Sequence, residues 1–319
     1  MEIIKLEKKY INQVIELALK NYEEEKEILS YLPEKEDFRK NIEKYINRIF
    51  EIGEGFLALK GEFLIGYLIG FEIPELFGKC KGVYSPLFAN GIVKENRKKI
   101  LQHLYSKCSE LWVEKNYTSH AITIYAQDVI SFETYSWLGF GMRCVDSIKE
   151  IKPTDEKTLI EIKKAEIKDA HLLEEISIEF ANYMKSSPLF MLHDPNDDHT
   201  KEHQEFLENQ NNHLWIAYND NKAIGYIKIQ PEGETFISLH EKVMNITGAF
   251  VLPEYRNSNV ASSLLNIVEK WSLDNNYKLL GVDFESFNIL GSSFWNKYFT
   301  PYTYSLVRRI DERIGGDIN

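Results

Sequence analysis

The stretch VLPEYRNSNVASSLL, residues 251–265, changes character in its middle. An apolar run typical of a strand ends near Pro253, and a polar turn follows with Arg256 at its start. From Val260 the apolar residues recur at positions 260, 264, 267, 268 and 271, which is helical spacing. A strand, a turn of small polar residues and a helix present unpaired backbone N–H groups at the helix mouth. This pattern predicts an anion-binding turn.

Composition and charge bound the class of protein. The 319 residues suggest about two domains, and 44% hydrophobic with 27% charged residues is typical of a soluble globular protein. A net charge of −11 argues against nucleic-acid and anionic-membrane partners, which need clustered Lys and Arg. The three cysteines fit no metal-site spacing, the start lacks the layout of a signal peptide, and no apolar run could span a bilayer. We therefore expect a cytoplasmic protein without membrane or nucleic-acid partners.

The chain repeats itself at one constant spacing, close to half its length. EIIKLEKK at 2–9 resembles EIKKAEIK at 161–168, IGY at 65–67 recurs at 224–226, and Trp112 corresponds to Trp271. The polar segment KPTDEKT at 152–158 separates the two halves. We predict one fold used twice, with domains at residues 1–151 and 152–319.

The second half has the pattern of a mixed α/β domain. A strand near 159–166 and a helix near 168–184 come first, and a short helix follows the polar stretch from 193. HLWIAYN and AIGYIKIQ are separated by Asp220, Asn221 and Lys222, which predicts a hairpin. Strands are expected in KVMNITGAFVL, YKLLGVDF and YSLVRRI, with a short helix in GSSFWNKYF.

The turn resembles the signature of the GNAT superfamily of acyl-CoA-dependent N-acetyltransferases. There a strand ending in V-x-P-x-x is followed by [QR]-x-x-G-x-[GA] and a helix. The residues at these positions are Val251, Pro253, Arg256, Asn257, Ser258, Asn259, Val260 and Ala261. The resemblance implies two tandem acyl-CoA N-acyltransferase-like domains. Each would be a mostly antiparallel sheet with a central strand-turn-helix and flanking helices.

The resemblance also implies acetyl-CoA as co-substrate, with its pyrophosphate on the turn and on the helix amides that continue to Ser262. Asn259 replaces the first glycine of the signature. Asn tolerates left-handed backbone better than other non-glycine residues, so the turn can form, although its side chain adds bulk. The alternative is an ordinary turn in which Ser258 or Asn259 caps the helix.

A second family pattern follows in VDFESFNILGSSFWNKYF, where Asn288 and Gly291 match. The resemblance implies that the strands holding Val251 and Val282 diverge. The pantetheine amides would pair with the main chain at Phe250 and Val251 in that gap.

For catalysis the resemblance places a tyrosine near the thioester sulfur, but Trp295 stands at that position and cannot act as an acid. Tyr298 is the first substitute, before Tyr302 and Tyr304, and aromatic packing is the alternative for all three. Glu285 is the first candidate for the general base and Asp283 the second, with Glu241 and His240 also near the central strand. A solvated surface acid is the alternative for each carboxylate.

The first half lacks the phosphate-binding turn. Lys98, Lys99 and Ile100 follow Arg97 where the glycine of the signature belongs, and their bulk should obstruct a pyrophosphate. The second pattern is better kept, in Asp128, Ser131, Tyr135, Gly139 and Phe140. We predict a degenerate GNAT-like domain that does not bind CoA.

The resulting prediction is an acetyl-CoA-dependent N-acetyltransferase that acts on the amine of a small molecule, such as an antibiotic, an amino acid or a polyamine, by direct transfer. The alternative is a catalytically inactive acetyl-CoA-binding or protein-interaction module. We expect a monomer whose two domains imitate a dimer, or a homodimer. No metal is expected, although HDPNDDHTKEH brings His193, Asp194, Asp198, His199 and His203 together. This stretch is better interpreted as an acceptor-site loop.

Overall fold

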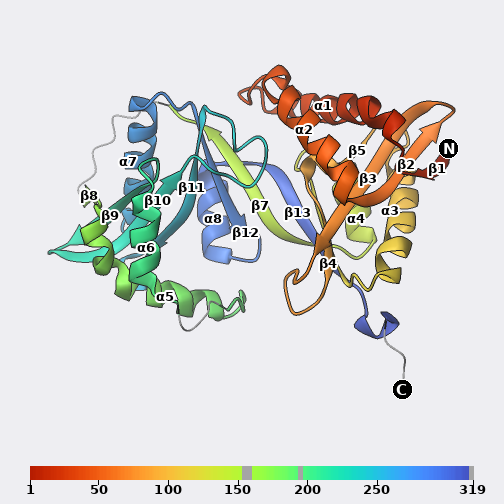
Figure 1. The fold of residues 1–319 in the computed structure, drawn as a ribbon. Coiled ribbons are helices and arrows are strands. Elements are labelled where there is room, and N and C mark those ends of the chain that lie inside the picture. The colour runs from red at the N-terminus through yellow and green to blue at the C-terminus, as the bar shows by residue number, and fades with distance from the viewer. Residues whose placement is uncertain (153–159, 193–196, 316–319) are drawn as a thin grey trace. The chain divides into compact units, whose positions relative to one another are not determined.

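The computed structural model describes residues 1–152, 160–192 and 197–315. The described residues form two compact units, shown along the chain in Figure 1. Unit 1 contains Met1–Asp146, Thr235–Ile237 and the described residues from Pro301. Unit 2 contains the described residues of Ser147–Glu234 and Ser238–Thr300. Each unit is a mixed α/β layer structure.

The sheet of unit 1 has the strand order β1-β2-β3-β4-β6-β13, and β5 pairs with β3. All pairs with printed register are antiparallel except β4 with β6, which run parallel. Helices α1 and α2 lie over one face, while α3 and α4 pack on the other face around Trp112 and Tyr105. The elements are β1 (Glu2–Lys5), α1 (Ile11–Ile28), α2 (Lys35–Ile52), β2 (Glu54–Lys60), β3 (Phe63–Ile73), β4 (Gly82–Ser85), β5 (Asn90–Ile92), α3 (Arg97–Glu114), β6 (Ser119–Tyr125), α4 (Val129–Trp137), β7 (Gly141–Glu150) and β13 (Thr300–Arg309), with short 3-10 turns at Lys8–Tyr10, Leu87–Ala89 and Glu312–Gly315.

The last strand of the chain completes the sheet of unit 1. Residues 303–309 of β13 pair antiparallel with β6, and Leu306 lies in the same core as Trp112. A second long-range insertion is Phe236, whose ring packs edge-on against Tyr22 and Phe38. Unit 1 is therefore built from both halves of the chain.

The sheet of unit 2 has the order β12-β11-β10-β9-β8, in which β11 and β12 run parallel and the other pairs are antiparallel. Next to the end of β7, the amide of Ile151 donates to the carbonyl of Lys278, just before β12, at 2.9 Å. The elements are β8 (Glu161–Lys164), a 3-10 segment at Ile167–Leu173, α5 (Glu174–Lys185), α6 (His199–Glu208), β9 (His213–Asn219), β10 (Lys222–Gln230), β11 (Val243–Val251), a 3-10 turn at Pro253–Tyr255, α7 (Val260–Asp274), β12 (Leu279–Glu285) and α8 (Ile289–Tyr298).

Successive side chains of β9 point to opposite faces of the sheet of unit 2, and each face is covered by helices. Leu214 and Ile216 belong to the core cluster with residues of α5 and α6, whereas Trp215 contacts Trp271 of α7. The predicted hairpin is present, and Asp220 and Asn221 in its turn both have positive φ, at 47° and 68°. This is the backbone that two-residue hairpin turns require.

The predicted repeat and the predicted fold class are confirmed element by element. Equivalent strands start at the spacing found in the sequence: β1 and β8 at Glu2 and Glu161, β3 and β10 at Phe63 and Lys222, and β7 and β13 at Gly141 and Thr300. The predicted domain boundary between 151 and 152 stays a prediction. The structure adds that unit 1 includes the C-terminal strand, and that the change of unit between Asp146 and Ser147 falls within β7.

Candidate active site

The turn before α7 has the backbone that an anion cradle needs. Asn257 and Asn259 both have left-handed backbone, with φ of 61° and 64°. Asn259 is the N-cap of α7, and its side chain makes no capping hydrogen bond. The first hydrogen bond of the helix runs from the amide of Ser263 to the carbonyl of Asn259, at 2.9 Å. The amides of Val260, Ala261 and Ser262 therefore precede the intrahelical ladder and are free for a ligand.

This geometry decides between the two interpretations of the turn. In the capping alternative, the side chain of Ser258 or Asn259 would accept from these amides. Instead, the Ser258 hydroxyl donates backward to the carbonyl of Tyr255, and the Ser262 hydroxyl donates to the carbonyl of Asn259 at 3.0 Å. The capping alternative is wrong.

Arg256 is held beside the turn as a cation. Its Nε donates to the carbonyl of Val251 at 3.0 Å. Its guanidinium carbon lies 5.0 Å from the ring centre of Phe250 and 5.3 Å from that of Tyr183. Among the described residues it has no carboxylate partner. The guanidinium is thus fixed by neutral groups and keeps its charge for an anionic ligand.

A cavity of about 390 Å³ opens next to this turn within unit 2. It is lined mainly by apolar and aromatic side chains from α5, β10, β11, α7 and α8, with Arg256 and Lys297 as its basic groups. Ten predicted site residues line it: Phe250, Val251, Arg256, Asn257, Asn259, Val260, Ala261, Ser262, Asn288 and Tyr298. Ser258 and Glu285 do not line it. The residues predicted to hold acetyl-CoA are therefore gathered around one cavity.

The two central strands diverge at the cavity. Their parallel ladder runs from Val243 with Leu279 to Ile246 with Val282 and ends there, although both strands continue. On its other side β11 stays paired with β10 as far as Val251. The edge of β11 that faces the gap can therefore supply amide and carbonyl groups to an extended ligand.

Asn288 is tied into the site by two hydrogen bonds. Its Oδ1 accepts from the amide of Gly291 at 3.0 Å, which caps α8, and from the hydroxyl of Tyr183 at 2.6 Å. Tyr183 and Phe180 come from α5 and line the cavity. Neither residue belongs to a motif, so neither was predicted from the sequence. The only signal was their place as aromatic residues on one face of a predicted helix.

The structure separates the three candidate tyrosines. Tyr298 lines the cavity at the end of α8, with Lys297 Nζ 5.0 Å from its ring centre. Tyr302 is buried in unit 1, where its hydroxyl lies 2.9 Å from that of Thr235, and Tyr304 is also part of unit 1. Trp295 lines the cavity and packs edge-on against Phe294.

Glu285 and Asp283, the first two candidates for the general base, lie on β12. Glu285 is half-buried at the C-terminal end of the strand. Asp283 keeps an exposed side chain, yet the protein packed around it raises its pKa to about 6, and the Glu234 carboxylate adds to the rise. Neither residue lines the cavity, so the role of Glu285 stays a prediction.

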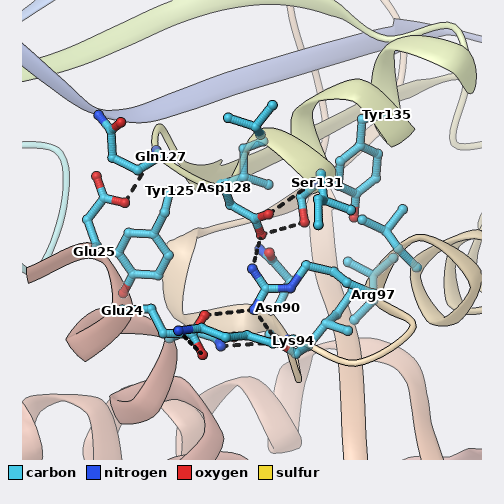
Figure 2. Close-up of a pocket in the computed structure, with 18 of the residues that line it drawn as sticks. Glu24, Glu25, Asn90, Lys94, Arg97, Tyr125, Gln127, Asp128, Ser131 and Tyr135 are labelled. Carbon is cyan, nitrogen blue, oxygen red and sulfur yellow. Dashed lines mark hydrogen bonds and ion pairs between the residues drawn. The ribbon is translucent and has the colours of Figure 1, made fainter. Parts of the chain in front are cut away.

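Unit 1 has a cavity of about 380 Å³ at the corresponding place (Figure 2). Asn96 is the N-cap of α3 with φ of 54° and no capping hydrogen bond, like Asn259 before α7. Arg97 therefore takes the place of Val260 as the first helical residue, not that of Arg256. The sequence did not reveal this correspondence, because Arg97 and Val260 are separated by more residues than the equivalent strands before and after the turn.

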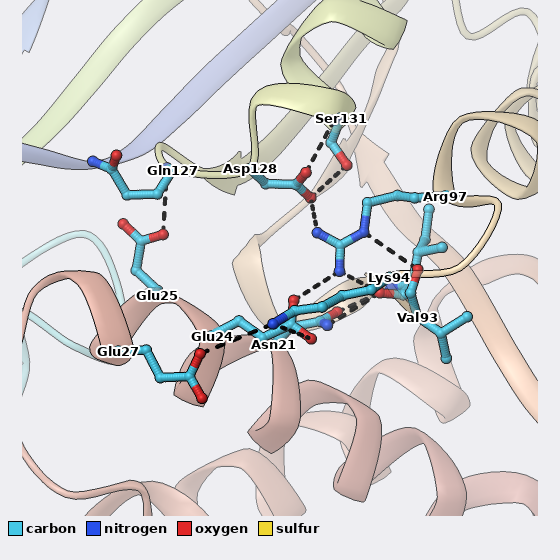
Figure 3. Close-up of polar contacts among 11 residues, drawn as sticks. Asn21, Glu24, Glu25, Glu27, Val93, Lys94, Arg97, Gln127, Asp128 and Ser131 are labelled. Atoms are coloured by element: carbon cyan, nitrogen blue, oxygen red, sulfur yellow. Dashed lines mark hydrogen bonds and ion pairs between the residues drawn. The ribbon is translucent and has the colours of Figure 1, made fainter.

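The Arg97 side chain is buried across the mouth of α3 (Figure 3). Its guanidinium forms ion pairs of 2.8 Å with both Glu24 and Asp128, and it donates to the carbonyl of Ile92 at 2.8 Å. Of the three residues that were expected to obstruct a pyrophosphate, Lys98 and Lys99 are exposed and Ile100 is buried in the core with Trp112. The residues that were expected to block the turn are therefore the wrong ones, because it is the Arg97 side chain that lies across the mouth of α3.

The gap between the diverging strands of unit 1 is bridged as well. The Asn90 side-chain amide donates to the carbonyl of Thr123 on β6, at 3.0 Å, and to the carbonyl of Pro86 at 3.2 Å. In unit 1 a side chain of the protein thus bridges the gap that corresponds to the one in which pantetheine is expected to lie in unit 2.

The histidine-rich stretch is partly described. His193 and Asp194 lie outside the described residues. Asp198 caps α6 through the amide of Lys201, and His199 contacts Glu202 at 3.3 Å. His203 is buried, with its Nε2 2.9 Å from the hydroxyl of Ser177, and burial lowers its pKa to about 4. In the described part of the chain, no three His, Cys, Asp or Glu side chains are grouped as metal ligands.

A mixed sheet whose central strands diverge beside an uncapped helix N-terminus defines an acyl-CoA N-acyltransferase-like fold. Comparison with known proteins agrees. Residues 179–289 match the model of the Acetyltransferase (GNAT) family. The matched region lies within the second repeat of the chain, and members of this family use acyl-CoA.

Solved structures resemble the whole chain at low sequence identity. A GCN5-related N-acetyltransferase from Sphaerobacter thermophilus is 11% identical, with 97% of this chain and 95% of that chain covered and a TM-score of 0.61. An acetyltransferase of the GNAT family from Colwellia psychrerythraea is 10% identical, with 98% and 100% covered and a TM-score of 0.47. At such identities the first structure supports the fold alone. No curated protein sequence matches this chain. Within the described residues no helix is long and apolar enough to cross a membrane.

Proposed function

We propose that unit 2 binds acetyl-CoA in its cavity and transfers the acetyl group directly to the amine of a small molecule. The observation that carries this proposal is the uncapped N-terminus of α7 next to Arg256. Three free amides, the helix dipole and a cation without a carboxylate partner among the described residues converge there. The pyrophosphate of CoA has the charge and the size of group that such a site binds.

The rest of the cofactor follows the divergence of the strands. From the α7 turn the pantetheine arm extends along β11, where Phe250 and Val251 offer main-chain groups at amide spacing. The thioester then lies toward Tyr298 and Trp295, which line the same cavity. In this pose the amide of Val251 is the candidate donor to the oxyanion.

Direct transfer needs a neutral amine, because an ammonium group has no lone pair for attack. The amine nitrogen forms a bond to the thioester carbonyl carbon, and the carbon–sulfur bond breaks. The proton lost by the amine leaves through water to a carboxylate, for which Glu285 is our candidate, and Tyr298 donates a proton to the departing thiolate. We expect Glu285→Gln to lower turnover at least about tenfold. A near-normal rate would remove Glu285 from the mechanism.

The second candidate function is an acetyl-CoA-binding module without catalysis. It is favoured by Trp295 at the position of the usual acid, and by the absence of both β12 carboxylates from the cavity lining among the described residues. The two functions share the cofactor site and differ in turnover.

Calorimetric titration of acetyl-CoA into the full chain tests the cofactor site. We expect micromolar affinity at one site per chain, because in unit 1 Arg97 lies across the mouth of α3 and Asn90 bridges the gap between the strands. The double variant Arg256→Ala, Asn259→Trp should lose this binding. Two molecules of acetyl-CoA per chain, or full affinity in the double variant, would contradict the assignment. Release of free thiol during a screen of amines separates the enzyme from the module.

A further inference from the structure

A buried carboxyl group in the wall of the unit 1 cavity has few hydrogen-bond partners within the protein. Glu25 of α1 lines the cavity and is 2% exposed. Its Oε2 accepts a single long hydrogen bond, from the amide of Gln127 at 3.3 Å, while its Oε1 has no hydrogen-bond partner among the described residues. A buried carboxyl oxygen without a donor is costly, so its presence at a cavity wall points to a donor that arrives with a ligand.

The basic side chains of this cavity are already engaged elsewhere. Arg97 is paired with Glu24 and Asp128, and Lys94 lies 4.0 Å from Glu24 and 3.9 Å from Glu27. Neither forms an ion pair with Glu25, as Figure 3 shows. Four carboxyl groups therefore face two basic groups in the lining, and an incoming ligand meets an acidic environment.

The other walls suit the rest of a small organic cation. Tyr67 and Tyr125 line the cavity, and Figure 2 shows Tyr125 beside Glu25. Tyrosine rings attract ammonium groups through their faces. Ile28, Val129 and Ile130 also line the cavity, and all three are exposed, so they form an apolar rim.

We propose that the cavity of unit 1 binds a small organic cation, an ammonium group carrying an apolar chain, with the ammonium group at Glu25 and the chain along the aliphatic rim. An anion such as a pyrophosphate would be repelled by the carboxylates that surround Arg97. A metal ion would lack its ligand set, because no group of three suitable side chains occurs among the described residues. This site is separate from the acetyl-CoA site and does not depend on it.

The protonation of Glu25 sets the condition for the test. Burial raises the pKa of Glu25 to about 8, and Asp128 contributes to the rise, while the Gln127 amide opposes it. A bound cation takes the place of this proton. At about pH 8.5 the carboxyl group is mostly ionised and an alkylammonium group is still charged.

The experiment is calorimetric titration of n-hexylammonium into the full chain at this pH, with 1-hexanol as the neutral control of matched shape. We expect saturable binding of one hexylammonium per chain and at least about tenfold weaker binding of 1-hexanol. Equal binding of the two would show that the cavity takes up apolar chains without regard to charge, and it would overturn the proposal. So would the absence of hexylammonium binding at about 10 mM, since a buried carboxylate should hold an ammonium more tightly. This comparison uses the unaltered protein and needs no variant to fold.

Two variants then locate the site. Glu25→Gln preserves shape and removes the charge, and it should weaken hexylammonium at least about tenfold. Glu27→Gln is the matched control, because Glu27 lines the same cavity from the same helix but is exposed; its effect should stay below about threefold. Unchanged affinity in Glu25→Gln, or competition by saturating acetyl-CoA, would place the cation elsewhere and overturn the proposal.

Discussion

Placing a negative charge at the mouth of α7 should both stabilise the protein and weaken cofactor binding. Ser262 is the third residue of α7, lines the cavity, and its hydroxyl contacts only the carbonyl of Asn259 among the described residues. Aspartate at this position accepts from the free amides and complements the helix dipole. The two effects have opposite signs because helix and cofactor compete for the same amides.

The magnitudes follow from the geometry. An acidic residue in the first helical turn contributes roughly 0.3–1 kcal/mol to stability, which corresponds to a rise in Tm of about 1–4 °C. A carboxylate about 5 Å from a doubly charged pyrophosphate costs at least about 1.5 kcal/mol even at the dielectric constant of water. Ser262→Asp should therefore weaken acetyl-CoA more than about tenfold while it raises Tm.

The assay compares Ser262→Asp with Ser262→Asn, which has nearly the same shape and no charge. Thermal unfolding without ligand measures the first effect and calorimetric titration of acetyl-CoA measures the second. If both variants bound acetyl-CoA equally well, the pyrophosphate would not lie at the α7 turn. A lower Tm for Ser262→Asp than for Ser262→Asn would refute the argument that these amides are free.

Three further predictions test other parts of the structure. In steady-state kinetics, Tyr298→Phe should lower kcat at least about tenfold and leave the KM for acetyl-CoA nearly unchanged, because it removes a proton donor and not a binding group. A normal kcat would exclude Tyr298 as the acid. Asn259→Gly should change the free energy of unfolding in urea by less than about 1 kcal/mol, because φ of 64° suits glycine and no cap is lost. The variant should bind acetyl-CoA at least as tightly as the unaltered protein. A clear loss of affinity would give the Asn259 side chain a binding role. Burial raises the pKa of Glu25 from 4.5 to about 8, so the folded state holds a proton that the unfolded state has released and stability should decrease as pH rises through this window. Urea unfolding of Glu25→Gln should show a flatter profile over the same range, and parallel profiles would show that Glu25 does not titrate in this way.

Short-range pattern was sufficient for the fold and for most of the candidate cofactor site. The constant spacing between similar segments predicted the repeat, because two copies of one fold place equivalent strands and helices at the same interval along the chain. The turn at Arg256–Val260 was predicted from residue types alone, since left-handed backbone at Asn259 is a local property of the chain. Asn288 was predicted from its match to the second family pattern, and the structure adds that its side chain caps α8 through the amide of Gly291.

The remaining features depend on contacts between residues far apart in the chain. Tyr183 reaches Asn288 across 105 residues, and Arg97 meets Glu24 across 73, so no local pattern relates these partners. The sequence also does not determine that β13 pairs with β6. The alternation of apolar and polar residues along a strand predicts which face is buried, but not which strand lies beside it. The unsatisfied carboxyl of Glu25 is the clearest case. In the sequence it is one glutamate among several on an amphipathic helix, and only the packing of unit 1 removes it from water.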